Sequence, residues 1–275
     1  MTLRIIDKII HGIDTSDGAG VNLKRIIGNP ELNMLDPFLL LDEFGSENPK
    51  DYISGFPSHP HRGFETITYM LNGKFRHKDS FGNEGILSDG SVQWMTAGKG
   101  VIHSEMPEQT DGLLRGFQLW LNLPKKLKMI EPSYYDIPQE IIPKVDFPRG
   151  SIKIISGTYN KVKGPGNPHT EMFYYDIMLD DNAKFNIPLK NDWNVFIYVY
   201  EGSIMLDKHV TKQNLAVLST TGDLEISTTN NSAKLILVGG QPINEPVARG
   251  GPFVMNTKQE VLQAFSDYQN GLLDK

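Results

Sequence analysis

Short apolar segments recur along this chain, and turn residues separate them. The segments are rich in β-branched and aromatic residues, and turn pairs such as Asn72-Gly73 and Glu201-Gly202 follow two of them. Such residues favour strands, and short strands at this spacing predict an antiparallel sandwich or barrel. The predicted strands are Thr66–Leu71, Leu114–Leu121, Ser151–Ser156, Phe173–Leu179, Val195–Tyr200 and Lys234–Val238.

A proline-rich stretch divides the chain. Proline fixes φ and lacks an amide hydrogen, so this stretch forms neither a long helix nor a central strand. We interpret residues 126–150 as a linker over the surface, between domains at residues 1–125 and 151–275. The prolines that define it are Pro124, Pro132, Pro138, Pro143 and Pro148.

The two sides of the linker resemble each other. Thr66–Gly73 (TITYMLNG) matches Val195–Gly202 (VFIYVYEG) at an offset of 129. Asp89-Gly90 resembles Thr221-Gly222 at an offset of 132. These weak matches predict a duplicated β-barrel.

The end of the chain has a helical pattern instead. Thr257 and Glu260 have capping-box spacing, and apolar residues follow at helical intervals. We therefore predict a short amphipathic C-terminal helix that packs on a barrel. Its apolar residues are Val261, Leu262, Phe265 and Tyr268.

Composition excludes several classes of function. None of the 275 residues is cysteine, which excludes disulfides, thiolate catalysis and iron–sulfur clusters. The net charge of −6 gives no general attraction to nucleic acid or anionic lipid. We interpret the one basic cluster, Lys125–Lys128, as a solvated linker face. No apolar run is long enough for a membrane helix, and the polar start predicts no signal peptide, so we expect a cytoplasmic protein.

Two short pairs of residues carry candidate chemistry. In His59-Pro60-His61, proline keeps the chain extended, and extended residues two apart project to the same face. His103-Ser104-Glu105 follows the turn glycines Gly98 and Gly100 and is expected to behave in the same way. On neighbouring strands, the two pairs would bring three imidazoles and a carboxylate to one point.

Such a ligand set suits a divalent first-row metal: Fe, Mn, Co, Ni, Cu or Zn. Four protein ligands on a six-coordinate ion leave two positions for substrate or dioxygen. The alternative interpretation, that each histidine is an ordinary surface or hydrogen-bonded residue, suits His11, His77 and His209. His169-Thr170-Glu171 has the same spacing but lacks a partner pair.

The segments GFPSHPHRGFETITYMLNG and DGSVQWMTAGKGVIHSE resemble the two motifs of the cupin superfamily, in the form found in pirins. The stretches Leu35–Phe44 and Gly239–Pro246 also resemble pirins. The resemblance covers nearly the whole chain and is densest in the first half. It implies an all-β bicupin, with two antiparallel jelly-roll barrels and one metal in the N-terminal barrel.

Site residues follow from the resemblance. The pirin metal ligands correspond to His59, His61, His103 and Glu105. Many other cupins use the carboxylate at Glu65 as a ligand, so here we expect Glu65 to hold a histidine or water from outside the ligand set. Arg62 would act on the site electrostatically. For both Glu65 and Arg62, packing or surface exposure is the alternative.

In the second half no ligand set survives, because the offsets of 129 and 132 align the ligand motifs with other residue types. The aligned residues are Pro188, Lys190, Asn194, Leu235 and Leu237. Apolar residues flank the two metal motifs, and those that face the metal would line a pocket for a flat aromatic substrate. These residues are Phe56, Trp94, Met95, Phe117 and Trp120.

Resemblance to bacterial pirins implies quercetin 2,3-dioxygenase activity. One Fe(II), or a similar ion, would bind a flavonol through its 3-hydroxyl oxygen together with dioxygen, and Glu105 would accept the proton. The alternative is a redox-sensing co-regulator that binds a protein partner, as some eukaryotic pirins do. A sugar isomerase is a third option, which the aromatic surroundings of the motifs disfavour.

Overall fold

Antiparallel strands dominate the structure, a computed structural model that describes residues 2–275. The chain forms two compact units. The first unit contains residues 13–28, 38–139 and 243–275, and the second contains residues up to Gly12, 29–37 and 140–242. All six predicted strands are present, and within the described residues one α-helix follows them.

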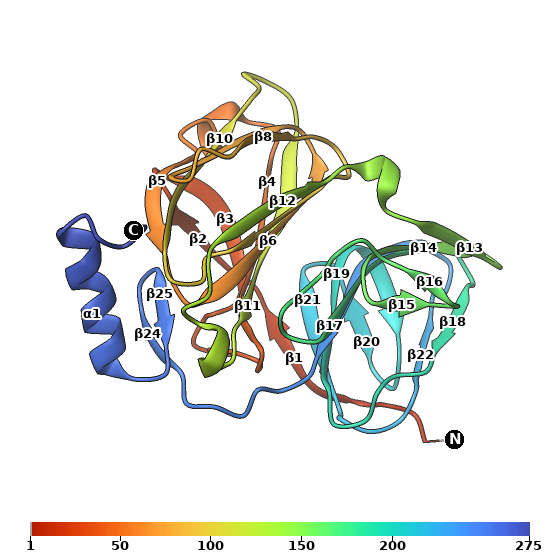
Figure 1. Ribbon diagram of the computed structural model, residues 1–275. Coiled ribbons are helices and arrows are strands. Elements are labelled where there is room, and N and C mark those ends of the chain that lie inside the picture. The colour runs from red at the N-terminus through yellow and green to blue at the C-terminus, as the bar shows by residue number, and fades with distance from the viewer. Residues whose placement is uncertain (1) are drawn as a thin grey trace. The chain divides into compact units, whose positions relative to one another are not determined.

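The first unit has two main sheets (Figure 1). The seven-stranded sheet runs β12 (Ser133–Ile137), β9 (Val92–Thr96), β6 (Phe64–Asn72), β11 (Leu114–Asn122), β4 (Phe38–Ser46), β3 (Val21–Ile27) and β2 (Ile13–Asp17). The four-stranded sheet runs β5 (Phe56–His61), β10 (Val101–Pro107), β7 (Phe75–Asp79) and β8 (Glu84–Leu87). The first unit also contains a separate two-stranded sheet, formed by β24 (Ala248–Gly250) and β25 (Phe253–Met255).

The main path of the second unit also has seven strands. It runs β1 (Ile6–His11), β21 (Asn214–Leu218), β19 (Asn194–Met205), β23 (Ala233–Gly240), β17 (Met172–Leu179), β14 (Gly150–Ser156) and β13 (Lys144–Phe147). Joined to it are β18 (Lys184–Ile187), β20 (His209–Thr211) and β22 (Leu224–Ser227), and β15 (Thr158–Tyr159) pairs with β16 (Val162–Lys163).

In both units the sheets keep open edges, so the predicted barrels are not closed. Three 3₁₀ turns lie at Pro49–Asp51, Lys125–Leu127 and Gln139–Ile141. The apolar core of the second unit forms one large cluster, in which strand residues such as Ile177, Ile197 and Leu235 are fully buried.

The two ends of the chain belong to other units than the predicted division at residues 125 and 150 implies. Strand β1 pairs with β21 of the second unit, although it precedes the first unit in sequence. Residues 243–275, including the helix, belong to the first unit. Each terminal segment adds to a part of the fold that its unit provides: β1 extends the sheet of the second unit beside β21, and α1 packs against β24 and β25 in the first.

The proline-rich stretch also contributes strands. Its residues Ser133–Ile137 form β12 against β9, and Lys144–Phe147 form β13 against β14. Both strands end the order of their sheets, which is the position where flanking prolines are tolerated. The stretch is therefore a connection with two edge strands rather than a bare linker.

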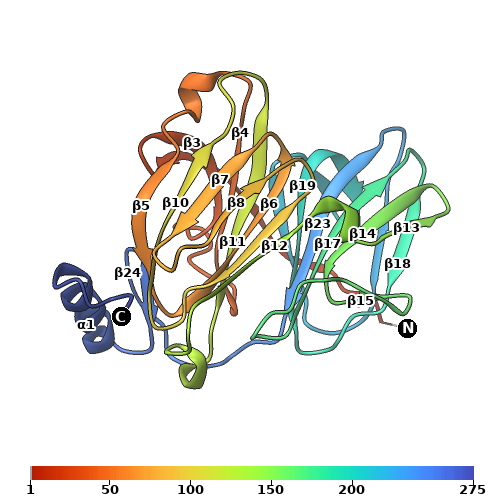
Figure 2. The same cartoon turned by 45° about the horizontal axis from the view of Figure 1, so that its top comes forward.

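The C-terminal helix, α1, runs from Lys258 to Gln269 and begins with the predicted capping box between Thr257 and Glu260. It lies beside β24 and β25 of its own unit (Figures 1 and 2). Within residues 2–275, no helix combines the length and the apolar character that spanning a bilayer requires.

Candidate metal centre

Strands β5 and β10 position the predicted metal ligands. They pair antiparallel, with His103 directly opposite His59 and Val101 opposite His61. Strand β5 is at the edge of its sheet and so accommodates Pro57 and Pro60 without losing ladder bonds. His61 and His103 are buried, while His59 is half-buried.

A glycine makes the turn after the first pair possible. Gly63 has φ of +89°, and a Cβ atom there would lie 2.1 Å from the carbonyl oxygen of Val254. Any other residue would be strained in backbone and in packing. This turn takes the chain from β5 directly into β6 and keeps the histidines against the interior.

The three histidines form one cluster. Their ligand atoms all lie within 4.8 Å of one another, and the Nε2 atoms of His59 and His61 are 3.1 Å apart. The His103 ring centroid is 4.4 Å from that of His59 and 5.0 Å from that of His61. Three of the four predicted ligands therefore converge, as the two-residue spacing and strand pairing required.

Hydrogen bonds to backbone carbonyl oxygens orient two of the three rings. His59 Nδ1 lies 2.8 Å from the carbonyl oxygen of Pro57, and His61 Nδ1 lies 3.3 Å from that of Pro252. A carbonyl can only accept, so both rings carry the proton on Nδ1 and leave Nε2 free to ligate. His103 Nε2 is buried without a hydrogen-bond partner.

Burial favours the neutral form of two of the three imidazoles. Burial lowers the pKa of His61 and of His103 well below the usual value, and neighbouring imidazoles lower it further. Neutral imidazole is the form that binds metals. The convergence of nitrogen atoms, the fixed tautomers and the unpartnered Nε2 of His103 all fit a divalent metal ion.

His77 was predicted to be solvated, and this was wrong: it is fully buried. Its Nδ1 lies 3.5 Å from Nδ1 of His103, and its ring stacks on Tyr134 at 4.3 Å with 15° between the planes. His77 therefore supports His103 much as the carbonyl oxygens support the other two histidines. Its local sequence, FRHKD, alternates with charged residues and gives no sign of burial.

Glu105 is buried on the same face of β10 as His103, but its carboxylate has other partners. Thr68 Oγ1 donates to it at 3.0 Å and Gln118 Nε2 at 3.1 Å. An extra residue in β5 shifts the register between His103 and Glu105. Among residues 2–275, the side chains that converge as a possible metal cluster are only the three histidines, so the assignment of Glu105 as a fourth ligand stays a prediction.

Glu65 and Arg62 are both buried. Glu65 accepts a hydrogen bond from Thr96 Oγ1 at 2.8 Å and a longer one from Trp94 Nε1 at 3.4 Å. Arg62 forms an ion pair with Asp267 of α1 at 2.6 Å. Arg62 thus ties the C-terminal helix to the segment that carries the histidines, and its predicted electrostatic effect on the site stays a prediction.

Lys128 contradicts the prediction of a solvated basic cluster. The other two lysines of that cluster are exposed, but Lys128 is buried. Its Nζ donates to the carbonyl oxygens of Gly63 and Val254, each at 2.8 Å, and to Asn122 Oδ1 at 2.7 Å. All three ammonium donors are satisfied, and they fasten the Gly63 turn to β25.

A cavity of about 530 Å³ opens onto two of the three histidines, His59 and His61. Phe56 and Trp120 line it, as predicted for two of the flanking aromatic residues. The others do not line it: Trp94, Met95 and Phe117 are buried core residues.

Charged residues form another part of the cavity wall. The Arg249 guanidinium lies 4.8 Å from the centre of the Trp120 ring, and Arg25 binds Asp42 through two hydrogen bonds. The pKa of Asp42 is raised to about 6 because burial outweighs the effect of Arg25.

Comparisons with known proteins agree with this geometry. The Pirin family model matches residues 20–121, and the model of the Pirin C-terminal cupin domain matches residues 174–274. The chain is 46% identical to a pirin-like protein of Caulobacter vibrioides, over 98% of this chain and 99% of that one. It is 39% identical to Pirin of Homo sapiens, over 94% and 89%. A solved structure of quercetin 2,3-dioxygenase from Acinetobacter baumannii has a TM-score of 0.92 at 32% identity, covering 99% of each chain.

Proposed function

Because this chain belongs to the pirin family and has two cupin domains, we propose that it is a metal-dependent dioxygenase that opens the central ring of flavonols, as quercetin 2,3-dioxygenase does. The observation that carries the proposal is the cluster of three histidines, two of which line a cavity of about 530 Å³. The similarity to the Acinetobacter baumannii enzyme supports the choice of reaction.

The metal would be held by the Nε2 atoms of His59, His61 and His103, with Glu105 as the fourth ligand. Glu105 is two residues from His103 on the same face of β10, which supports this assignment. We expect Fe(II). When bound, the ion would supply Lewis acidity and open coordination positions for substrate oxygen atoms.

The surrounding residues prepare the site for a flat, hydroxylated substrate. Trp120 and Phe56 offer ring faces on which an aromatic substrate can stack. Arg249 presents a positive charge beside Trp120, where it would stabilise a deprotonated flavonol. The carboxylate of Glu105, held by Thr68 and Gln118, would accept the proton of the 3-hydroxyl group.

The test is quercetin consumption under air by protein reconstituted with Fe(II). The absorbance of quercetin should fall and carbon monoxide should be released in equal amount. His59→Ala should abolish both signals, and Glu105→Gln should lower the rate at least a hundredfold. His11→Ala, which changes an exposed histidine, is the matched control. Turnover that is independent of metal, or unchanged in His59→Ala, would refute the proposal.

A second candidate is a metal- and redox-responsive binding protein. The 39% identity with human Pirin over 94% of this chain favours it, because some eukaryotic members of the family act as co-regulators. A change in oxidation state would alter the charge of the site and bias a nearby surface. Capture of one partner by only the ferrous or only the ferric protein, with no quercetin turnover, would favour this candidate over the enzyme.

A further inference from the structure

The second unit contains a cavity of its own, of about 570 Å³. Its walls come from the end of β14, the β15–β16 hairpin and the loop after it, the start of β17, the end of β18 and the loop 188–193. This volume is in the usual range for small-molecule sites. The metal cluster of the first unit contributes nothing to it.

This cavity is the counterpart of the metal cavity. The seven-strand paths of the two units correspond position by position, so β17 takes the place of β4 and β18 that of β5. The metal cavity is lined by β4 residues Leu40 and Asp42 and by β5. The second cavity is lined by β17 residues Phe173 and Tyr175 and by β18. The same place in the fold is therefore open in both units.

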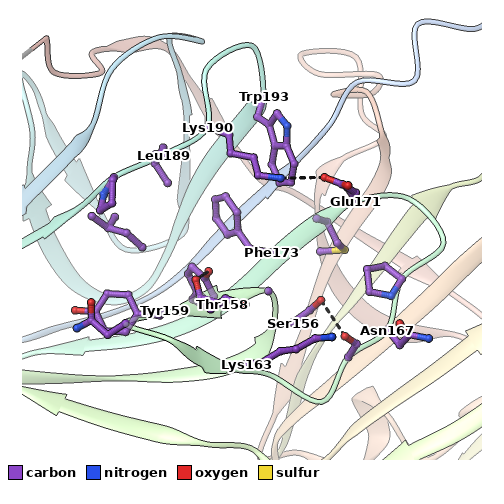
Figure 3. Close-up of a pocket in the computed structure, with 18 of the residues that line it drawn as sticks. Ser156, Thr158, Tyr159, Lys163, Asn167, Glu171, Phe173, Leu189, Lys190 and Trp193 are labelled. Carbon is purple, nitrogen blue, oxygen red and sulfur yellow. Dashed lines mark hydrogen bonds and ion pairs between the residues drawn. The ribbon is translucent and has the colours of Figure 1, made fainter.

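Parallel aromatic rings dominate the second cavity (Figure 3). Phe173 lies 6.1 Å from Trp193 with 10° between the ring planes, and 4.9 Å from Tyr175 with 15° between them. The Tyr175 hydroxyl donates to the carbonyl oxygen of Thr158 at 2.8 Å, which fixes its ring. The three rings stack on one another and are almost fully buried, so they form a rigid apolar wall against which a planar ligand can pack.

A glycine makes this arrangement possible. Gly239 is opposite Phe173 in the β17–β23 pair, and a Cβ atom at Gly239 would lie 2.4 Å from the Phe173 ring. In the first unit the corresponding pair is Leu40 and Trp120. The large aromatic side chain of this pair is therefore on β11 in the first unit and on β17 in the second, and a cavity is present in both.

The charge of the second cavity is positive, although the chain as a whole is negative. Its charged lining residues are Lys163, Lys190 and Glu171. Lys190 Nζ binds Glu171 at 2.9 Å and lies 4.3 Å above the centre of the Trp193 ring. Lys163 has no carboxylate within ion-pair distance among residues 2–275. In Figure 3 the Phe173 ring lies between the two lysine side chains.

We propose that this cavity is a second ligand site, which binds a flat aromatic carboxylate. The ring of the ligand packs against the exposed parts of the Phe173 and Trp193 side chains, and its carboxylate pairs with the exposed Lys163. Apolar residues such as Ile187 and Leu189 close the wall around the ring. This site needs no metal and does not depend on the activity proposed for the first unit.

The test uses 2-naphthoate as the probe and 2-naphthamide as its neutral counterpart. Calorimetric titration of the metal-free full chain should show one saturable naphthoate site, with naphthamide at least fivefold weaker. Lys163→Gln should weaken naphthoate at least fivefold. Lys184→Gln, an exposed lysine on β18 that does not line the cavity, should leave the affinity unchanged.

Two further variants locate the probe. Trp193→Phe should keep the binding but lose most of the quenching of protein fluorescence by naphthoate. His61→Ala should change neither. The proposal is overturned if wild-type chain does not bind naphthoate at millimolar concentration. It is also overturned if His61→Ala removes the binding while Lys163→Gln does not, because the probe would then occupy the first unit.

Discussion

The two units use the same strand order but treat the same interior positions in opposite ways. In the first unit the β5–β10 pair places His59 opposite His103 and His61 opposite Val101. In the second unit the β18–β22 pair has the same place in the fold. There Phe185 is opposite Ile226, and Ile187 is opposite Leu224.

Loop length fixes this correspondence. Met95 of β9 pairs with Thr66, and Leu218 of β21 pairs with Val195, the residue that corresponds to Thr66. Val101 lies six positions after Met95, and Leu224 lies six positions after Leu218. The register therefore places Ile226 at the position of His103, whereas the offset of 132 had pointed to Leu235. Phe185 and Ile187 take the positions of His59 and His61.

The two units also differ in the number of acidic, basic and histidine side chains that they bury. Among residues 2–275, the only acidic, basic or histidine side chains that the second unit buries are Arg4 and Asp176, and its core is otherwise mostly apolar. The first unit buries many more. They are Asp42, Glu43, His61, Arg62, Glu65, His77, His103, Glu105 and Lys128. Because each such group costs free energy unless it is paired, their concentration in one unit supports the proposal of a metal site in that unit.

The largest expected effect is the loss of metal affinity when one of the predicted histidine ligands is removed. His61→Ala should lower the affinity for divalent metal at least a thousandfold, about 4 kcal/mol, because it removes one of three converging nitrogens. The check is metal content by mass spectrometry together with calorimetric titration of Ni(II) or Fe(II). Ile187→Ala is the matched change in the second unit and should leave metal binding intact. Equal losses in both variants would contradict the contrast between the units.

The next effect is a loss of stability at Phe185, the apolar residue that takes the position of His59 in the second unit. Phe185→Ala should lower the free energy of unfolding by about 3–4 kcal/mol, because it leaves a cavity in a well-packed core. Urea denaturation measures this loss, and the metal content of the folded variant should remain that of wild type. A loss below about 1 kcal/mol would show that the core around Phe185 is not closely packed.

A smaller effect is expected at His77. His77→Ala should lower metal affinity ten- to a hundredfold, because His103 loses the partner that orients it. His77→Phe keeps the stacking on Tyr134 but not the nitrogen, so it should lose affinity to a similar extent while retaining stability. If His77→Phe binds metal as wild type does, the contact serves packing alone.

The smallest effect is a pH dependence at Lys128. Burial lowers its pKa to about 8, against 10.5 in the unfolded chain. Between these values the unfolded chain binds more protons at this group, so the free energy of unfolding should rise as the pH increases from 8 to 10.5. Relative to Lys128→Met, the wild type should gain on the order of 1–2 kcal/mol over this range. A constant difference would show that the ammonium keeps its ordinary pKa.

Local patterns predicted much of the fold and part of the site. Strand segments, the capping box and the histidine pair around Pro60 depend on nearest neighbours in sequence, and the structure contains all of them. The convergence of His103 with that pair needed only one assumption, that two strands are adjacent.

What depended on long-range register could not be predicted. The burial of His77 follows from the pairing of β7 with β10 and from Tyr134, which is 57 positions away. Burial of Lys128 requires carbonyl oxygens of Gly63 and Val254 at the right distance. The assignment of each terminal segment to the unit distant in sequence could not be predicted, because the local sequence of each segment indicates only an ordinary strand or helix.

The most direct test of the account is anomalous diffraction from crystals grown anaerobically with Fe(II), recorded at the iron absorption edge. We predict one strong peak in each chain, about 2.0–2.2 Å from Nε2 of His59, His61 and His103, the usual range for imidazole ligation. A map without a peak at the three histidines, or with its peak elsewhere, would contradict the assignment of this cluster as the metal centre.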